Sequence, residues 1–211
     1  MIDATERRYD VAIVGAGPVG CVCAIAHARK GYRVALFEAN PSAAKRLAGE
    51  WLHPPAVQVA GEVPSNSGEG CAVLPEDGQE PILLPYSDGS RSLVCEHAAL
   101  VSHLRQVAGD DPAIDLLLHA RVRTVEDGRI TFTQDGVSST VLAERIVGAD
   151  GRSSVVRRSL GLATQTRTCS RMIGLTLKGV SLPFEGYGHV VSGAPGPMPI
   201  YRLTEDRVPA V

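Results

Sequence analysis

The sequence predicts an α/β fold that begins with a strand, a helix and a second strand, and three observations support this. An apolar run over residues 11–14 stops at Gly15, which is typical of a buried parallel strand. Small residues dominate residues 19–30, which indicates a helix leaving that strand. A second apolar run, residues 34–37, is followed by the single acid Glu38. Because strands and helices that alternate in this way build a parallel sheet, we expect one βαβ unit here.

Three glycines between the first strand and the helix have separate physical roles. Gly15 allows a tight turn, Gly17 lets backbone N–H groups approach phosphate oxygens, and Gly20 lets the helix pack closely on the strand. The free N–H groups and the positive end of the helix dipole favour an anion without a basic side chain. The segment therefore predicts a site for a dinucleotide pyrophosphate. The alternative is a glycine-rich turn of another α/β protein, with an accidental spacing to Glu38.

Glu38 is the candidate ligand for the adenosine ribose. A helix, a turn at Gly31 and a short strand separate it from Gly20, and they would place its carboxylate against both ribose hydroxyls. An acid at this position disfavours a 2′-phosphate. We therefore expect the ADP half of FAD or NAD, and not that of NADP.

Length and composition are those of a globular protein with a real core: 211 residues, 44% of them hydrophobic and 21% charged. The formal net charge of −2 gives no electrostatic footprint for nucleic acid. No apolar stretch approaches the roughly eighteen residues of a membrane span, and the N-terminus lacks the hydrophobic core of a signal peptide. We expect a cytoplasmic protein with no transmembrane segment. The five cysteines lack metal-ligand spacing, so we interpret them as reduced thiols, a redox or metal role being the alternative.

Strands dominate the rest of the chain, with one further helix. Residues 82–86 and 92–95 are strand-like, and the turn residues between them predict a hairpin. Apolar residues recur at helical spacing over residues 97–107, and Gly109 is expected to end that helix. Five strands should then form a meander, namely residues 114–118, 120–125, 129–133, 138–142 and 145–147. Three later strands are predicted at residues 172–179, 189–192 and 199–203.

The last strand of the expected meander leads into a turn that carries an acid. Asp150 at the strand end can accept hydrogen bonds from backbone amides or from a water bound to a pyrophosphate, and Gly151 permits a sharp turn. Ser154 can cap a short helix that Gly161 ends. A purely structural turn is the alternative to a cofactor site.

Three segments together resemble the FAD-dependent monooxygenases of the aromatic-hydroxylase superfamily, in particular their squalene-epoxidase-like branch. The first is the glycine segment with Glu38. The second, residues 45–54, is similar to the branch's Arg-x-x-Gly-Glu-Leu-x-x-Pro segment, whose arginine approaches the FAD ribose and phosphates. The third, residues 148–157, is similar to the family's Asp-Gly motif, which supports the use of both FAD and a reduced nicotinamide. Residues 186–189 and 195–201 also look like the branch's substrate-domain strands.

The resemblance implies a Rossmann-like FAD-binding domain with a β-meander over residues 1–165, with excursions at 51–95 toward a substrate domain. A β-rich substrate domain would begin at residues 166–211. His97 stands where many aromatic hydroxylases have a phosphate-contacting arginine, although a satisfied surface histidine is the alternative. The resemblance implies no catalytic protein residue, and it implies the cofactor-binding positions Gly15, Gly17, Pro18, Val19, Gly20, Glu38, Ala39, Arg46, Gly49, Glu50, His97, Val122, Asp150 and Gly151.

The activity implied by the resemblance is oxygen insertion through a flavin C4a-hydroperoxide, with NADH or NADPH as reductant and O₂ as co-substrate. The substrate would be a lipophilic isoprenoid, aromatic or polyketide-like molecule that is hydroxylated or epoxidised. A flavin-dependent dehydrogenase or reductase of the same fold and a non-catalytic dinucleotide-binding module are the alternatives. The family's later Gly-Asp segment, whose aspartate meets the FAD ribitol, does not occur in these residues. We therefore expect an N-terminal half that a second polypeptide, or the remainder of a longer chain, completes.

Overall fold

The computed structural model describes residues 7–44, 49–63, 65–169, 173–193 and 196–210. The chain divides into two compact units. The first unit comprises Met1–Ala44 and Val101–Arg167, and the second comprises Lys45–Leu100 and Thr168–Val211. Each unit is therefore built from two separate stretches of the chain.

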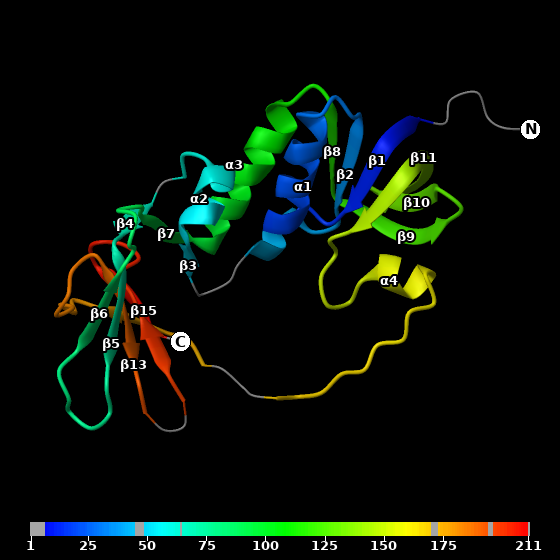
Figure 1. The fold of residues 1–211 in the computed structure, drawn as a ribbon. Helices are drawn as coiled ribbons and strands as arrows, with labels where there is room; N and C mark the ends of the chain where they lie inside the picture. Colours follow the sequence, from blue (N-terminus) through cyan, green and yellow to red (C-terminus); the bar gives the residue numbers. More distant parts are fainter. Residues whose placement is uncertain (1–6, 45–48, 64, 170–172, 194–195, 211) are drawn as a thin grey trace, which may run out of the picture. The chain divides into compact units, whose positions relative to one another are not determined.

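The first unit is built on a six-stranded sheet with the order β8-β2-β1-β11-β10-β9 (Figure 1). The strands β8, β2, β1 and β11 run parallel, whereas β11, β10 and β9 form an antiparallel meander. The helix α1 (Pro18–Ala28) connects β1 to β2 and packs on both, which confirms the expected βαβ unit. The strand bounds are Arg8–Val14 for β1, Val34–Glu38 for β2, Ile114–Leu118 for β8, Ala120–Glu126 for β9, Arg129–Gln134 for β10 and Val137–Gly148 for β11.

The expected five-strand meander is wrong in its first member. Residues 114–118 do form a strand, but β8 pairs in parallel with β2 at the other edge of the sheet. Residues 138–142 and 145–147 belong to one continuous strand, β11. An apolar run predicts a strand but does not name its neighbour. The neighbour of β8 is β2, a strand much earlier in the chain, so the local pattern could not identify it.

The core of the first unit explains why its central strands are apolar along their whole length. Val11, Ala12 and Ile13 are successive residues of β1, and all three are fully buried. Successive side chains of a strand point to opposite faces, so both faces of β1 are covered. The rings of Phe37 and Phe132 meet edge to face, with centroids 5.1 Å apart, and tie β2 to β10.

The second unit contains a six-stranded sheet with the order β12-β15-β14-β13-β5-β6 and a three-stranded sheet with the order β3-β7-β4. The bounds in the larger sheet are Gly70–Leu74 for β5, Ile82–Pro85 for β6, Leu175–Lys178 for β12, Tyr187–Val191 for β13, Met198–Ile200 for β14 and Arg207–Ala210 for β15. In the smaller sheet they are Gly49–Leu52 for β3, Asn66–Gly68 for β4 and Ser92–Glu96 for β7. The helix α2 (Pro54–Ala60) also belongs to the second unit, whereas the 3₁₀ turn Pro41–Ala44 belongs to the first. The helix α3 (His97–Asp110) begins in the second unit and continues into the first at Val101.

The hairpin predicted around residues 87–90 is wrong, although both of its strands exist. The turn forms, with Gly89 at φ 70° and the Asp88 carboxylate accepting from the Ser90 amide at 2.9 Å. However, β6 pairs with β5, whereas β7 pairs with β3 and β4. Turn chemistry acts over a few residues, but the pairing partner is chosen by burial. The side chains of β7 are largely buried, and those of β6 are exposed.

The other two predicted helices are also confirmed. The helix α3 runs one residue past Gly109, to Asp110. Ser154 caps α4 (Val155–Ser159), because its hydroxyl accepts from the Arg157 amide at 3.0 Å. Gly161, at φ 66°, follows that helix. None of the described helices is long and apolar enough to cross a membrane.

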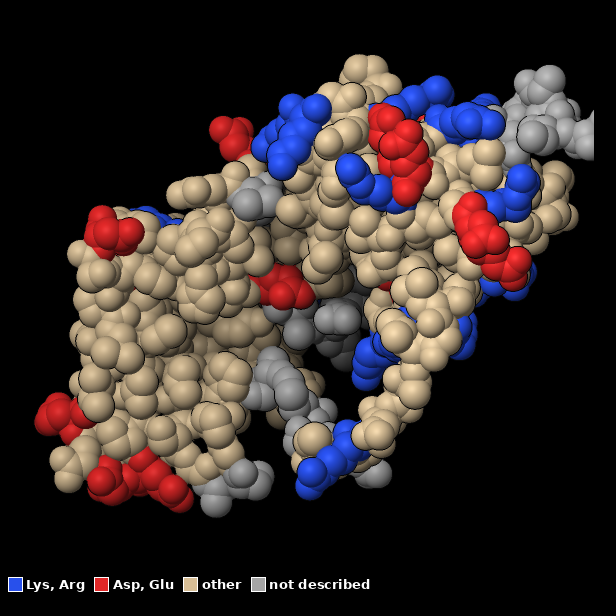
Figure 2. Space-filling view, turned by 45° about the vertical axis from the view of Figure 1, so that its right-hand side comes forward, with Lys and Arg blue, Asp and Glu red and all other residues tan. Residues whose placement is uncertain are grey.

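Charged side chains of both signs lie on the face drawn in Figure 2. Basic and acidic side chains are interspersed at its upper right, whereas its lower left shows acidic side chains alone. This distribution matches the near-neutral formal net charge of −2.

We expect Gly20→Ala to destabilise the protein strongly, because a Cβ at residue 20 would overlap the carbonyl oxygen of Gly15. Overpacking of this kind costs about 1–3 kcal/mol. Gly17→Ser is the matched control, since a Cβ there meets nothing within 4 Å and serine is a good N-cap residue. Urea unfolding followed by circular dichroism measures both variants. Equal stabilities would contradict the steric role of Gly20.

Candidate functional site

The candidate site lies at the carboxyl ends of three neighbouring strands of the first unit. Gly15 follows β1, Glu38 ends β2, and Gly148 ends β11. The register pairs Val14 with both Phe37 and Gly148, so the three strand ends are level. The connections change direction between β1 and β11. Ligands of open α/β sheets bind outside the strand ends at such a switch point.

The glycines of the loop after β1 differ in what surrounds them. Gly15 has φ 103°, and a Cβ on it would lie 2.5 Å from the carbonyl oxygen of Ala149. Gly20 packs against the carbonyl of Gly15, so neither residue has room for a side chain. A Cβ on Gly17, by contrast, meets nothing within 4 Å. The loop is therefore closed on the protein side and open beside Gly17.

The helix α1 begins beside this opening without a side-chain cap. Gly17 is the N-cap residue and makes no side-chain capping bond, and Pro18 follows it at the start of the helix. Val19 is 75% exposed, and the first turn carries no acid. A helix start of this kind leaves amide donors for an anion, and the helix dipole favours negative charge there.

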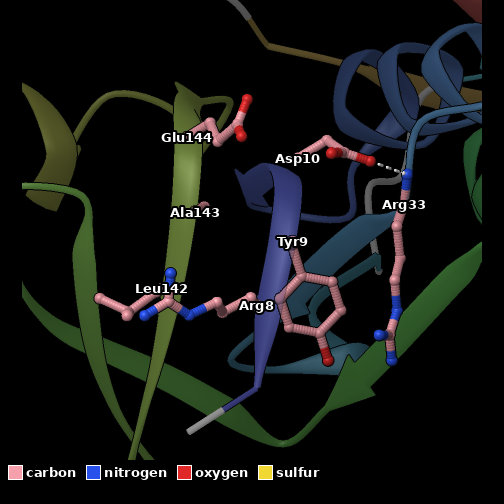
Figure 3. A pocket seen from close by; sticks show the side chains of 7 residues that line it. All are labelled: Arg8, Tyr9, Asp10, Arg33, Leu142, Ala143 and Glu144. Carbon is pink, nitrogen blue, oxygen red and sulfur yellow. Dashed lines mark hydrogen bonds between the residues drawn. The ribbon is translucent and has the colours of Figure 1, made fainter. Parts of the chain in front are cut away.

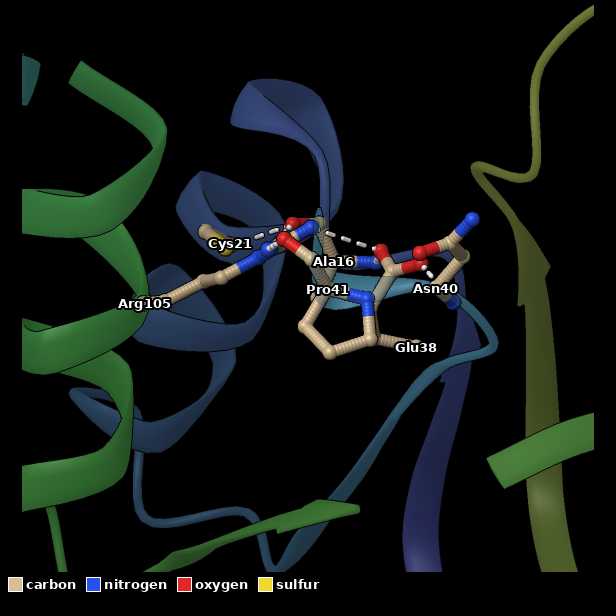
Figure 4. Close-up of polar contacts among 6 residues, drawn as sticks. All are labelled: Ala16, Cys21, Glu38, Asn40, Pro41 and Arg105. Atoms are coloured by element: carbon tan, nitrogen blue, oxygen red, sulfur yellow. Dashed lines mark hydrogen bonds and ion pairs between the residues drawn. The ribbon is translucent and has the colours of Figure 1, made fainter. Parts of the chain in front are cut away.

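Arg105 of α3 joins the parts of the site (Figure 4). Its Nε donates to the carbonyl of Ala16 at 2.7 Å, and its Nη1 donates to the carbonyl of Pro41 at 2.8 Å. Its Nη2 donates to Glu38 Oε2 at 2.9 Å, and both side chains of this ion pair are about 15% exposed. One guanidinium therefore holds the glycine loop, the end of β2 and the following turn together.

The Glu38 carboxylate already accepts hydrogen bonds from several protein donors. Its Oε2 also accepts from the Ala16 amide at 3.2 Å, and its Oε1 accepts from the Asn40 amide at 2.8 Å. A carboxylate offers about four acceptor positions, so these three bonds leave about one. The positive charge of Arg105 also offsets the negative charge of the Glu38 carboxylate, which we expected to repel a 2′-phosphate. Glu38 can therefore accept from one ribose hydroxyl at its remaining position, or from both hydroxyls if a protein donor is displaced. Ribose recognition by Glu38 stays a prediction.

The sequence analysis missed Arg105, although the helical pattern carries a signal for it. Leu100, Val101, Leu104 and Ala108 of α3 are buried. Arg105 lies four residues after Val101, so it falls on the edge of this apolar stripe. A charged residue at such a position indicates a partly buried ion pair. The pattern does not identify Glu38 as the partner.

Asp150 acts as an acceptor at the end of β11. Its Oδ2 accepts from the Val155 amide at 2.6 Å, which confirms the expected bond to backbone amides. Its Oδ1 is buried and has no hydrogen-bond partner among the described residues. Gly151 follows at φ 73°, as the sharp turn requires. A buried acceptor without a donor fits a site that a hydroxyl or a water on a pyrophosphate completes.

Two of the implied positions, Glu50 and His97, meet within the second unit. His97 Nδ1 lies 2.6 Å from Glu50 Oε1, and the imidazole is only 8% exposed. The alternative of a surface histidine is therefore wrong. Burial and the negative charge of Glu50 raise the pKa of the neighbouring Cys95 thiol to about 11. Gly49 starts β3 beside this pair, and Arg46 lies outside the described residues.

The remaining implied positions are less informative. Ala39 is half-buried directly after β2. The side chain of Val122 is 8% exposed and belongs to the core of the first unit, so only its backbone is available to a ligand.

None of the five cysteines forms a disulfide, and Cys169 is exposed. The described residues contain no cluster of His, Cys, Asp and Glu that could hold a metal ion.

A cavity of about 300 Å³ lies at the opposite end of β1 (Figure 3). Three of its lining residues, Tyr9, Asp10 and Arg33, interact with other groups of the protein. Tyr9 donates to Asp115 at 2.6 Å, and the Asp10 carboxylate accepts from the Arg33 amide at 2.6 Å. The Arg33 guanidinium also lies over the Tyr9 ring, 5.2 Å from its centroid. These contacts stabilise the start of the strand, and we do not interpret this cavity as the functional site.

Comparisons with known proteins agree with the geometry. The family described as "FAD dependent oxidoreductase" matches residues 10–69, and the family described as "FAD binding domain" matches residues 88–195. A squalene epoxidase of Aspergillus fumigatus is 30% identical over 96% of this chain and 47% of its own length. A digeranylgeranylglycerophospholipid reductase of Methanospirillum hungatei is 28% identical over 80% of this chain and 46% of its own length.

The crystal structure of pqsL, a probable FAD-dependent monooxygenase from Pseudomonas aeruginosa, shares the fold. Its TM-score is 0.76 over 97% of this chain and 60% of that chain, at 18% sequence identity. An identity this low bears on the fold alone. The chain spans about half the length of the curated relatives it matches.

We expect Arg105→Met to cost about 3–5 kcal/mol of folding free energy, because it leaves the Glu38 carboxylate largely buried without its cation. The double variant Glu38→Gln/Arg105→Met should recover part of this loss. Arg121→Met, at an exposed position of β9, is the control and should be nearly neutral. Chemical denaturation of the wild type, the single variants Glu38→Gln and Arg105→Met, and the double variant gives the coupling energy. Additive effects of the two single substitutions would refute the ion pair.

Proposed function

Since the chain belongs to the FAD-binding domain family of flavoproteins, we propose that it is the flavin-binding part of an FAD-dependent monooxygenase. One observation carries this proposal. The glycine loop, the acid Glu38 and the Asp150 turn come from segments far apart in the sequence, and they end three adjacent parallel strands at the switch point of the sheet. The space beside Gly17 and the unpaired Asp150 oxygen fit a dinucleotide.

The residues of the chain would bind and orient the cofactor without reacting. The amides after Gly17 would hold the pyrophosphate, Glu38 would hold the ribose, and the Asp150 turn would approach the pyrophosphate from β11. When bound, the flavin supplies the hydride and oxygen chemistry. Glu50 and His97, in the second unit, remain proposed cofactor contacts. The protein would also keep water from the reacting centre.

The complete enzyme would take electrons from NADH or NADPH and insert oxygen from O₂ into a lipophilic substrate by hydroxylation or epoxidation. The named relatives support this choice, because one is a squalene epoxidase and one structural neighbour is a probable FAD-dependent monooxygenase. The cytoplasmic location expected from the sequence stays a prediction.

A reductase of the same fold is the second candidate. The relative of Methanospirillum hungatei is a digeranylgeranylglycerophospholipid reductase, and its identity to this chain is nearly that of the epoxidase. Both candidates use the same cofactor site. They differ in whether an oxygen atom enters the product.

We expect the complete enzyme to bind FAD and to oxidise NADH or NADPH faster when its substrate is present. Mass spectrometry of the product after reaction under ¹⁸O₂ separates the candidates, because only a monooxygenase incorporates the label. Glu38→Ala should weaken FAD binding by about tenfold or more, equivalent to about 1.4 kcal/mol. Glu126→Ala, at an exposed position of β9, should not. A protein that binds no flavin at all would end the proposal.

We also propose that further polypeptide, from a second chain or from the rest of a longer one, covers the sheet of the second unit. Both edge strands of this sheet expose apolar side chains. Ile82 and Leu84 of β6 are 53% and 52% exposed, and Leu175 of β12 is 60% exposed. Unpaired strand edges with apolar side chains are normally covered or charged.

Native mass spectrometry of the protein purified from its own source should therefore show more polypeptide than these 211 residues. The 211-residue chain produced alone should self-associate, because its sheet edges can pair with other copies. Changing Ile82 and Leu84 to lysine should reduce that association. A 211-residue chain that is monomeric by light scattering would contradict this proposal.

A further inference from the structure

A partly open cavity of about 200 Å³ belongs to the second unit and lies against the indole ring of Trp51. Trp51 of β3, Val94 of β7 and Leu182 form its apolar lining. Polar groups come from Asn66, Ser67, Glu185, Tyr187 and Arg202. Small-molecule sites combine apolar walls with polar groups that fix the orientation of the ligand.

The indole wall of this cavity is held rigidly. A Cβ on Gly68 would lie 2.6 Å from the indole ring, and a Cβ on Gly188 would lie 3.0 Å from it. Two strands therefore carry glycine where the ring passes. The indole Nε1 donates to the Tyr86 hydroxyl at 3.2 Å, and the Tyr201 ring meets the indole edge-on at 5.8 Å. The wall is formed before any ligand arrives.

Arg202 keeps a donor for a ligand. It forms a bidentate pair with Glu185, at 2.7 and 3.0 Å, and donates to the carbonyls of Val180 and Glu205 at 3.2 and 3.0 Å. A guanidinium has five N–H groups, so one has no acceptor among the described residues. The side-chain amide of Asn66 makes one bond, from its Nδ2 to the Leu203 carbonyl at 2.9 Å. Its oxygen remains available within the described part of the chain.

The cavity is partly open, so its volume limits the part of a ligand that it can surround. An apolar cavity of about 150 Å³ holds benzene. The Trp51 cavity, at about 200 Å³, therefore fits one six-membered ring with a small substituent. A flat ring also matches a flat indole wall, because aromatic pairs gain energy beyond the area they bury.

We propose that the Trp51 cavity binds a single aromatic ring that carries a hydroxyl or carbonyl oxygen. The ring lies against Trp51 and Leu182, and its oxygen accepts from Arg202 or exchanges a hydrogen bond with Asn66. This inference selects the aromatic class among the substrates proposed above, and it rests on the proposed function only for the statement that the ligand is oxidised.

Trp51 is the only tryptophan of the 211 residues, so its fluorescence reports occupancy of the cavity without any flavin or turnover. We expect phenol to change this fluorescence saturably. Toluene, which lacks the oxygen, should bind about tenfold more weakly, the usual cost of one unpaired polar group. The five-carbon isoprenoid alcohol 3-methylbut-2-en-1-ol should bind more weakly than phenol. Equal binding of this alcohol and phenol would overturn the aromatic assignment.

Two substitutions locate the binding. Ser67→Phe places a ring at the cavity lining and should weaken phenol binding about tenfold or more, whereas Ser65→Phe, at an exposed residue outside the lining, should leave it unchanged. Arg202→Met should remove the difference between phenol and toluene. Circular dichroism checks that each variant is folded. Unchanged phenol binding in folded Ser67→Phe and Arg202→Met would overturn the inference.

Flavin binding is measured separately, by absorbance of the complete protein. A protein that binds FAD but shows no response of Trp51 to phenol would refute this inference and leave the proposed function standing. A protein that binds phenol in the Trp51 cavity but binds no FAD would refute the proposed function and leave this inference standing.

Discussion

The ion pair between Arg105 and Glu38 is the constraint on which the candidate site depends. The guanidinium reaches the Ala16 carbonyl and the Pro41 carbonyl as well as the carboxylate, so one side chain of α3 fixes the loop after β1 and the turn after β2. Because Arg105 and Glu38 are both largely buried, they stabilise the site only as a pair. The geometry of the loop and the position of the acid are therefore set together.

Close backbone packing sets the other side of the same loop. Gly15 lies against Ala149, and Gly20 lies against Gly15, so the loop, α1 and the end of β11 form one packed unit. This packing brings the Asp150 turn to the glycine loop, although the two are more than a hundred residues apart in the sequence. The opening that remains lies beside Gly17, at the start of α1. A dinucleotide would meet backbone that is already ordered, which reduces the entropy lost on binding.

The second unit differs from the first in its interior and in its exposed strand edges. Its interior is organised by Trp51, which two glycines accommodate and Tyr86 orients, whereas the outer strands β6 and β12 leave apolar side chains exposed. A rigid interior wall fits recognition of a small ligand. Exposed strand edges fit association with further polypeptide. The two features are independent, because one depends on the packing of a single ring and the other on the outer edges of β6 and β12, which have no neighbouring strand among the described residues.

The sequence by itself determined the βαβ unit, the glycine loop, the capped helix after Asp150 and the family resemblance, because each depends on residues close together in the chain. Only the tertiary structure decided that β8 joins β2, that β6 and β7 do not pair, and that Glu38 is bound by Arg105. Local patterns identify the strands, helices and turn residues. They do not identify which strands pair or which charged residues meet, because this is decided by which distant apolar faces and charges are buried together.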